Sequence, residues 1–394
     1  MGKYLKEFEL ISQYEEYINS DMAILPNVSI INDINGVYYN PKVPNYLKFT
    51  AEEDNSTISL KSKTSPDIKY SLNGGDWTQW DYSAITLNIG DTVRMKGNNI
   101  NGFNTSDSSY NQFQMTGKIG ASGNIMSLLY EDDYEGKLTI PCDYCFCRMF
   151  LGCTALTTAP ELPATTLVGG CYIGMFSNCT SLTVAPKLPA TTLAIGCYQV
   201  MFSGCSTLTN APELPATTLV GYCYGGMFQG CSSLTNAPEL PATTLTDSCY
   251  SGMFYGCTSL TNAPELPATT LANYCYVDMF YDCTSLTTAP LVLPATTLAD
   301  NCYIGMFYNC RSLTNAPELP ATILAKYCYQ YMFSGCTNLN YIKMLATDIS
   351  ADYCLDGWVY GVSSTGTFVK DPNMTSLPTG DSGIPTGWTV QDAA

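Results

Sequence analysis

The sequence contains no histidine and few positive charges, with 17 lysines and arginines against 34 aspartates and glutamates. The formal net charge of −17 would repel phosphate backbones and anionic lipids, so we expect neither nucleic acid nor a membrane surface as a partner. The absence of histidine removes the most common general base and the most common zinc ligand. No apolar run reaches about 18 residues, so the sequence predicts no membrane insertion.

The first residues, MGKYLKEFELISQYEEYINS, lack the apolar stretch and the small-residue cleavage site of a secretory signal. We therefore expect synthesis in the cytoplasm without a signal peptide. This expectation bears on the 19 cysteines, which in a short secreted chain would indicate a disulfide scaffold. Their odd number and the missing signal favour buried free thiols, with one disulfide per repeat as the alternative.

The cysteines reveal an internal repeat. Two columns, eight residues apart, recur every 26 residues, except for one step of 27 at Leu291 and Val292. The first column is Cys145, Cys171, Cys197, Cys223, Cys249, Cys275, Cys302, Cys328 and Cys354, and the second is Cys153, Cys179, Cys205, Cys231, Cys257, Cys283, Cys310 and Cys336. Because 17 of the 19 cysteines keep this register, the cysteines are structural.

Each repeat divides into two halves with different patterns. The apolar stripe Leu193, Cys197, Tyr198, Met201, Phe202 and Cys205 predicts a short helix. The residue before each second-column cysteine is always glycine, asparagine or aspartate, types that tolerate the left-handed conformation at a helix end. The other half, such as 234–240 (LTNAPEL), predicts a short strand whose prolines keep its pairing incomplete.

Units of the form FxGCTSL…LP…L resemble the BspA-like leucine-rich repeats, which are common in surface proteins of gut Bacteroidales and in their phages. The resemblance covers about residues 125–345, although the unit is 26 residues long rather than the usual 23 and carries an unusual CYxxMF block. It implies an α/β solenoid in which stacked strand-plus-short-helix coils share one core.

The sequence predicts four segments. Residues 1–45 hold an amphipathic helix over 4–18 and an attachment segment that resembles the N-termini of structural proteins of Bacteroidales phages. Residues 46–116 predict a small all-β sandwich with a hairpin at Asn73-Gly74-Gly75. Residues 117–345 form the solenoid, with an N-terminal cap at 115–129. Residues 346–394 form a C-terminal cap module, resembling the modules that follow such repeats.

A cysteine cluster and a column of glutamates are the two candidates for a metal or catalytic site. Cys142, Cys145, Cys147 and Cys153 are closely spaced, but no second CxxC pair follows, so we predict no metal. The glutamate column favours a solvated edge, with calcium as the alternative; it consists of Glu161, Glu213, Glu239, Glu265 and Glu318. Repeated, identical carboxylates lack the asymmetry of a hydrolase site, so we predict no catalytic residue, no cofactor and no enzyme.

The positions that vary between repeats are the candidates for recognition. Tyrosines occupy two of these columns, one before the first-column cysteine and one after Met-Phe, and they offer large contact area with a hydroxyl group. The alternative is that these rings only cover the coils, and for Trp77 and Trp80 in the β region core packing is favoured. The candidate binding residues are Tyr222, Tyr255, Tyr274, Tyr281, Tyr308 and Tyr327, of which Tyr255, Tyr281 and Tyr308 should form a row.

These features favour a non-enzymatic recognition protein. The resemblances imply a phage virion component, such as a tail or head fibre or receptor-binding protein, that contacts a host-surface glycan or protein. Its N-terminal region would attach to other virion proteins, and a homotrimer is possible for a fibre. The first alternative is a BspA-like adhesin on the bacterial cell surface, and the second is a glycan-active hydrolase.

Overall fold

The computed structural model describes residues 30–31, 38–39 and 44–394. The chain divides into two compact units, Met1–Asn45 and Tyr46–Ala394. In the first unit, β1 (Ile30–Ile31) pairs antiparallel with β2 (Tyr38–Tyr39). The helix predicted over 4–18 lies outside the described residues. No helix within the described ranges has the length and apolar character needed to span a membrane.

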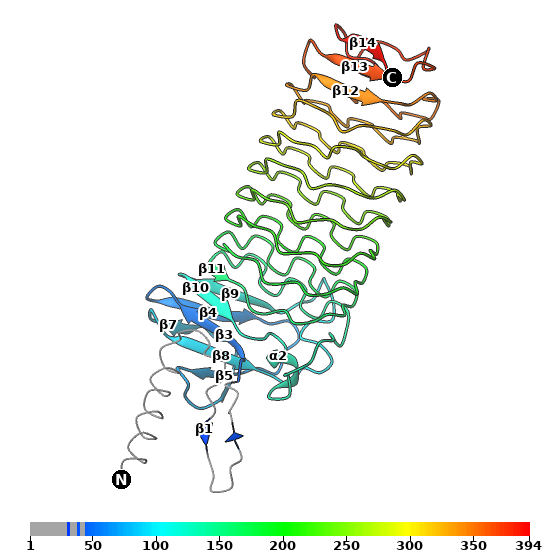
Figure 1. The fold of residues 1–394 in the computed structure, drawn as a ribbon. Helices are drawn as coiled ribbons and strands as arrows, with labels where there is room; N and C mark the ends of the chain where they lie inside the picture. The colour runs from blue at the N-terminus through cyan, green and yellow to red at the C-terminus, as the bar shows by residue number, and fades with distance from the viewer. Residues whose placement is uncertain (1–29, 32–37, 40–43) are drawn as a thin grey trace. The chain divides into compact units, whose positions relative to one another are not determined.

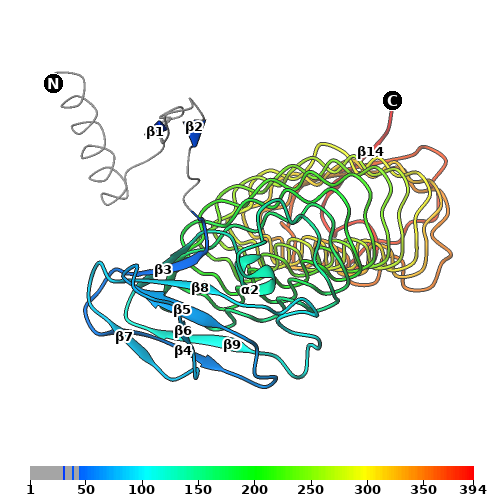
Figure 2. The same ribbon diagram turned by 90° about the horizontal axis from the view of Figure 1, so that it is seen from below.

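The second unit begins with two β-sheets that lie face to face (Figures 1 and 2). One sheet has the strand order β11-β10-β3-β8-β5-β6 and the other has the order β7-β4-β9. The strands are β3 (Leu47–Ala51), β4 (Ser56–Lys61), β5 (Lys69–Leu72), β6 (Thr78–Gln79), β7 (Ile85–Leu87), β8 (Thr92–Lys96), β9 (Gln112–Thr116), β10 (Ile119–Ser122) and β11 (Leu156–Thr158).

Alternating burial along these strands explains the two layers. In β3, Leu47, Phe49 and Ala51 are buried while the residues between them are half-buried, so one face of the sheet points to the core. Phe49 meets Phe113 of β9 across the sheets, with ring centroids 5.3 Å apart. The predicted hairpin is confirmed, because β5 pairs antiparallel with β6 and its turn has positive φ at Asn73 and Gly74.

The sheet of the β region continues directly into the repeats. Strand β10 pairs antiparallel with β3 on one side and parallel with β11 of the first coil on the other, and it is followed by the short helix α2 (Ser127–Tyr130). Strand β10 therefore covers the edge that the first coil would otherwise expose, in the segment where the sequence predicts an N-terminal cap.

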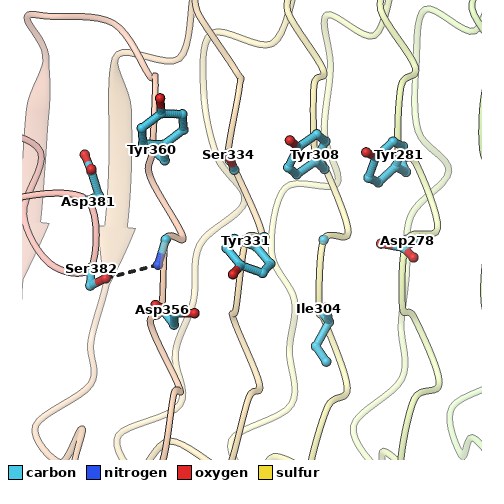
Figure 3. A pocket seen from close by; sticks show the side chains of 12 residues that line it. Asp278, Tyr281, Ile304, Tyr308, Tyr331, Ser334, Asp356, Tyr360, Asp381 and Ser382 are labelled. Carbon is cyan, nitrogen blue, oxygen red and sulfur yellow. Dashed lines mark hydrogen bonds between the residues drawn. The ribbon is translucent and has the colours of Figure 1, made fainter.

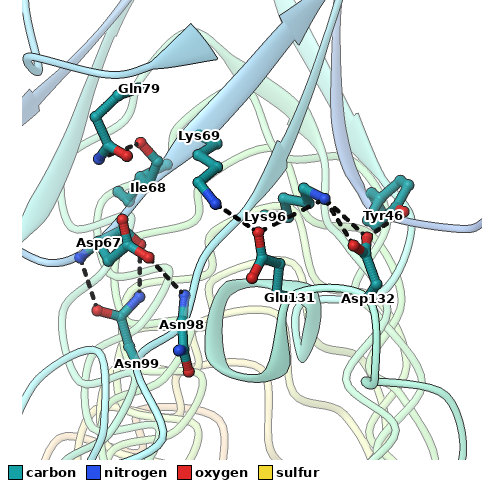
Figure 4. Close-up of polar contacts among 10 residues, drawn as sticks. All are labelled: Tyr46, Asp67, Ile68, Lys69, Gln79, Lys96, Asn98, Asn99, Glu131 and Asp132. Atoms are coloured by element: carbon teal, nitrogen blue, oxygen red, sulfur yellow. Dashed lines mark hydrogen bonds and ion pairs between the residues drawn. The ribbon is translucent and has the colours of Figure 1, made fainter. Parts of the chain in front are cut away.

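Ion pairs connect the β region to the residues that follow α2 (Figure 4). Lys96 Nζ lies 2.8 Å from Asp132 Oδ2 and 3.6 Å from Glu131 Oε1, and Lys69 Nζ lies 2.7 Å from the same Glu131 oxygen. Lys96 is buried, and its ammonium group also lies over the Trp77 ring, 4.7 Å from the centroid. Asp132 thereby compensates a cation that has lost most of its water.

The helix predicted in each repeat is wrong. Within the described residues the repeats contain no helix; the segment from Ile195 to Gly204 is a series of turns. Left-handed residues recur every four positions there, at Gly196 (φ +59°), Val200 (φ +47°) and Gly204 (φ +76°). A right-handed helix cannot contain such residues in its interior. We call this segment and its equivalents in the other coils the turn ladder.

The backbone hydrogen bonds of the turn ladder alternate between two partners. Amides such as Gln199 N–H donate to the carbonyl three residues earlier, while their neighbours, such as Tyr198 and Val200, donate to carbonyls of the next coil, 3.1 and 2.8 Å away. Each coil is thus tied to the next along the whole ladder, which satisfies the backbone groups that a helix would have bonded internally.

The strand half of each repeat pairs weakly, as predicted. Single parallel bridges join equivalent positions of successive coils, for example Asn210 to Asn236 and Asn236 to Asn262. The prolines that follow cannot donate to a ladder, so pairing does not extend.

The interior of the solenoid is a set of stacked columns. Rings repeat from coil to coil, so that Phe202 lies 5.7 Å from Phe228 and Tyr198 lies 5.9 Å from Tyr224, nearly parallel. All 19 cysteines are free thiols, as favoured by the sequence. Each second-column thiol donates to a phenylalanine carbonyl oxygen of the preceding layer at 2.9–3.1 Å, which explains a small buried donor at this position.

The C-terminal segment ends the stack with a parallel sheet of β12 (Tyr341–Met344), β13 (Thr367–Lys370) and β14 (Thr389–Asp392) (Figure 1). Trp358 is fully buried beneath the last rings of the core, 6.4 Å from Tyr329. On its other side Trp358 meets Phe368 of β13, with ring centroids 6.2 Å apart, so the core continues into the C-terminal segment.

Candidate functional site on the turn face

The outward side of the turn ladder, which we call the turn face, carries the variable side chains. Apolar pairs point inward every four residues, so the two residues between them point outward. The left-handed backbone at many of these outward positions is occupied by residues other than glycine; Tyr222, Tyr274 and Tyr327 have φ values of 56–58°. This conformation costs a residue other than glycine roughly 1–2 kcal/mol. Backbone conformation alone would favour glycine at these positions, so it does not explain the tyrosines there.

The predicted tyrosine row is confirmed. Tyr255 stacks on Tyr281 with ring centroids 4.6 Å apart, and Tyr281 stacks on Tyr308 at 4.5 Å. Burial and the neighbouring Tyr308 raise the pKa of Tyr281 to about 12, so its hydroxyl stays protonated at neutral pH.

The other three predicted tyrosines lie in the column before the first cysteine. Tyr222 and Tyr274 are about half-exposed and separated by Ser248, which stands between them in the intervening coil. Tyr327 stacks on Tyr353 at 5.0 Å. The structure thus brings together one half of the predicted set and leaves the rest as separate rings or pairs.

The tyrosine row ends in a hollow of about 560 Å³ (Figure 3). Tyr281 and Tyr308 form one side, and Ser334 takes the place where the next tyrosine of the row would stand. Beyond Ser334, Tyr360 resumes the row. Serine stands here in the position that a tyrosine ring occupies in the two preceding coils, and Ser334, 3% exposed, lies at the floor of the hollow.

Two further side chains shape the hollow because glycines face them. The Tyr331 ring packs on Gly357, where an added Cβ would lie 2.6 Å from its Cε1 atom. The Asp278 carboxylate leans over Gly305 in the same way, so that an added Cβ would lie 2.3 Å from its Oδ1 atom. Neither arrangement tolerates a side chain at the facing glycine.

The hollow is acidic. Asp278, Asp356 and Asp381 line it, and the described part of the chain contributes no lysine or arginine to the lining. Burial raises the pKa of the Asp278 carboxyl to about 6, and the charge of Asp356 raises the pKa of Tyr331. One Asp356 oxygen accepts a hydrogen bond from Gln330 Nε2 at 2.9 Å. Asp356 also takes part in a side-chain hydrogen bond with Tyr331.

The sequence missed Tyr331, Tyr360 and the three aspartates. A usable signal existed for Tyr360, which follows Cys354 by six residues, as Tyr308 follows Cys302. It was overlooked because this coil reads LDGWV in place of Tyr-x-x-Met-Phe. The hollow itself, by contrast, depends on the absence of a side chain at Ser334.

The other sequence candidates lie elsewhere. Trp80 is buried in the core of the β region, and Trp77 packs on Lys96. Among the described residues no group of three or more cysteine or acidic side chains could hold a metal ion, in the glutamate column or at Cys142. Cys142 and Cys147 instead donate to carbonyl oxygens of Asn104 and Ser106 at 3.4 and 3.3 Å, joining the first coil to the β region.

Comparison with known proteins identifies the repeats. The model of the BspA type leucine rich repeat region matches residues 171–306 and 276–353 in six copies. Residues 171–353 are therefore a BspA-type leucine-rich-repeat region. Among solved structures it is similar to a leucine-rich repeat protein from Bacteroides ovatus ATCC 8483, with 15% identity over 65% of this chain and 83% of that chain and a TM-score of 0.25. A search of curated protein sequences finds no match.

Proposed function

We propose that this chain, with its BspA-type repeats, is a non-enzymatic recognition protein of the adhesive kind, and that it binds a cell-surface protein or glycan through the turn face. The observation that carries the proposal is the stacked row Tyr255–Tyr281–Tyr308 opening into the hollow at Ser334. These rings are half-buried, and rings that are already ordered by stacking lose little entropy when a partner covers them, which favours binding.

Catalysis is a weaker interpretation of the same hollow. A hydrolase would need two carboxylates about 5–9.5 Å apart. Asp278 and Asp356 belong to coils separated by three steps, so at about 4.8 Å a step their backbones are roughly 14 Å apart. The raised pKa of Asp278 is therefore explained by its partial burial and does not require a catalytic role.

The more specific role, a phage tail or head fibre or receptor-binding protein, rests on the resemblance of residues 1–45 to phage structural proteins. We keep it as a prediction, with attachment to other virion proteins through that segment and possible trimerisation. Peptides of this chain in the proteome of purified phage particles would support it; particles that lack the chain would overturn it and favour the cell-surface adhesin.

The binding proposal is tested with the full 394-residue chain. The chain and two matched double variants are applied to a panel of immobilised surface proteins and glycans. Replacing Tyr281 and Tyr308 by alanine should weaken binding by about tenfold or more, as expected for interface aromatics. Replacing Glu239 and Glu265 by alanine, in the glutamate column, should leave it unchanged. Equal binding by both double variants, or no binding by the parent chain, would overturn the proposal.

A further inference from the structure

The geometry of the turn face points to a more specific ligand: we propose that the hollow at Ser334 is a slot for one planar cation, the guanidinium group of an arginine on a protein partner. This inference rests on the proposed recognition function and narrows its partner to a protein. It depends on the spacing of the rings, on the carboxylates around them and on the shape of the guanidinium group.

The slot is the width of one missing ring. Successive rings of the row are 4.5–4.6 Å apart. Tyr308 and Tyr360 stand one coil to either side of Ser334, so two steps of about 4.8 Å separate their positions by roughly 9.6 Å. A flat group midway between them would lie about 4.8 Å from each ring, within stacking distance. In Figure 3 the space above Ser334 is bordered by Tyr308 on one side and Tyr360 on the other.

The ring faces that border the slot are available. Within the described residues the stack stops at Tyr308, whose second face is turned toward Ser334 rather than toward another ring. Tyr360 is 62% exposed. A ligand can therefore contact ring faces here, whereas both faces of Tyr281 are covered by neighbouring rings.

The charge around the slot selects a cation. Asp278 leans toward Gly305 in the coil of Tyr308, and Asp356 and Asp381 lie on the side of Tyr360, so carboxylates line the hollow at both of its ends. A neutral sugar could stack on the same rings but would leave these carboxylates without a cation. Arginine combines a flat face for the rings with a fork of donors for a carboxylate, and lysine does not. The slot therefore fits arginine better than lysine or a pyranose.

The test compares three blocked pentapeptides that differ only in a central residue flanked by glycines: arginine, lysine or citrulline. Citrulline keeps the planar shape and loses the charge. Binding to the full chain is followed by NMR of ¹³C-labelled tyrosine rings. We expect the arginine peptide to bind in the millimolar range and citrulline about tenfold more weakly or worse, as for a lost cation–π contact and ion pair.

Matched variants place the binding in the slot. S334Y restores the missing ring and should abolish arginine binding. Y360A removes one of the two bordering rings and D278N removes one negative charge, and each of these variants should weaken arginine binding several-fold. Retention of the parent circular dichroism spectrum controls for folding, and Y222A, at a separate ring, should bind as the parent does. Equal affinity for arginine and citrulline, or arginine binding retained in S334Y, would overturn the proposal, as would the absence of any arginine binding by the folded chain.

A separate arm distinguishes this failure from failure of the broader function. The same NMR titration is run with methyl glycosides. Glycoside binding that S334Y removes, without arginine binding, would overturn the arginine slot and leave recognition by the turn face standing. Loss of both, together with a parent chain that binds nothing on the surface panel, would remove the proposed function as well.

Discussion

Replacing Gly252 by alanine distinguishes a turn ladder from a helix, because the two structures predict opposite signs. In a helix interior, alanine in place of glycine stabilises the protein by about 1 kcal/mol. In the turn ladder Gly252 has a φ of +60°, a conformation that costs alanine roughly 1–2 kcal/mol. The gain from a less flexible unfolded chain offsets about 0.4–1 kcal/mol of this cost.

Crowding does not complicate the estimate. The nearest atom to an added Cβ at Gly252 is Tyr255 Cβ, 4.0 Å away, an ordinary contact. The net expectation is a destabilisation of about 1 kcal/mol. Gly221 is the matched control, since its φ lies outside the left-handed range and an added Cβ would meet its nearest atom at 3.5 Å. G221A should be neutral or stabilising by a few tenths of a kcal/mol.

The assay is equilibrium unfolding in urea, followed by circular dichroism, for the parent, G252A and G221A. Repeat proteins can lose two-state behaviour, so the comparison uses the midpoint and slope of each variant rather than one extrapolated value. A lower midpoint for G252A alone supports the turn ladder. A higher midpoint for G252A would mean that the segment is helical and that the derivation of the turn face is wrong.

Three further predictions follow from burial and packing. Between about pH 4 and 6 the folded chain keeps a proton on Asp278 that the unfolded chain loses, so the stability of the fold decreases as pH rises through this window. In thermal melts, D278N should therefore stabilise the fold by on the order of 1 kcal/mol at pH 7.5 and hardly at all at pH 4. Hydrogen bonding with Cys145 lowers the pKa of Cys142, whereas burial raises the pKa of Cys205 to about 12. Iodoacetamide should therefore modify Cys142 before Cys205 in the native chain, as followed by mass spectrometry, and equal labelling of the two would contradict this. Phe228→Ala should cost about 3–5 kcal/mol in urea unfolding, and a cost below about 1 kcal/mol would mean that the stacked core is wrong.

The sequence predicted the repeat, the stacked core and one column of left-handed residues, because each follows from residue type at a fixed spacing. Its error was the helix. The apolar residues from Leu193 to Cys205 recur at intervals of 4.0 rather than 3.6 residues. At about 100° per residue, that spacing spreads them over roughly 180° of a helix, too wide for one stripe. Tyr222 and Val200 also hid the other left-handed columns, since neither residue type indicates positive φ.

The candidate site was predictable only in part. The row of Tyr255, Tyr281 and Tyr308 followed directly from the register, because one residue per coil at a fixed position must stack. The hollow beside it did not, since it requires knowing that Ser334 leaves a gap. The lean of Asp278 over Gly305 depends on backbone conformation in two coils, which no pattern of residue types specifies.

The most direct test of the central claim, that the hollow at Ser334 is the recognition site, is S334Y measured for stability and for binding on the same surface panel. A ring at this position would stack on Tyr308 and Tyr360, adding about 0.5–1.5 kcal/mol for each pair before the entropy of ordering it. We predict a higher melting temperature together with loss of binding. A variant that folds as well as the parent and still binds would contradict the account.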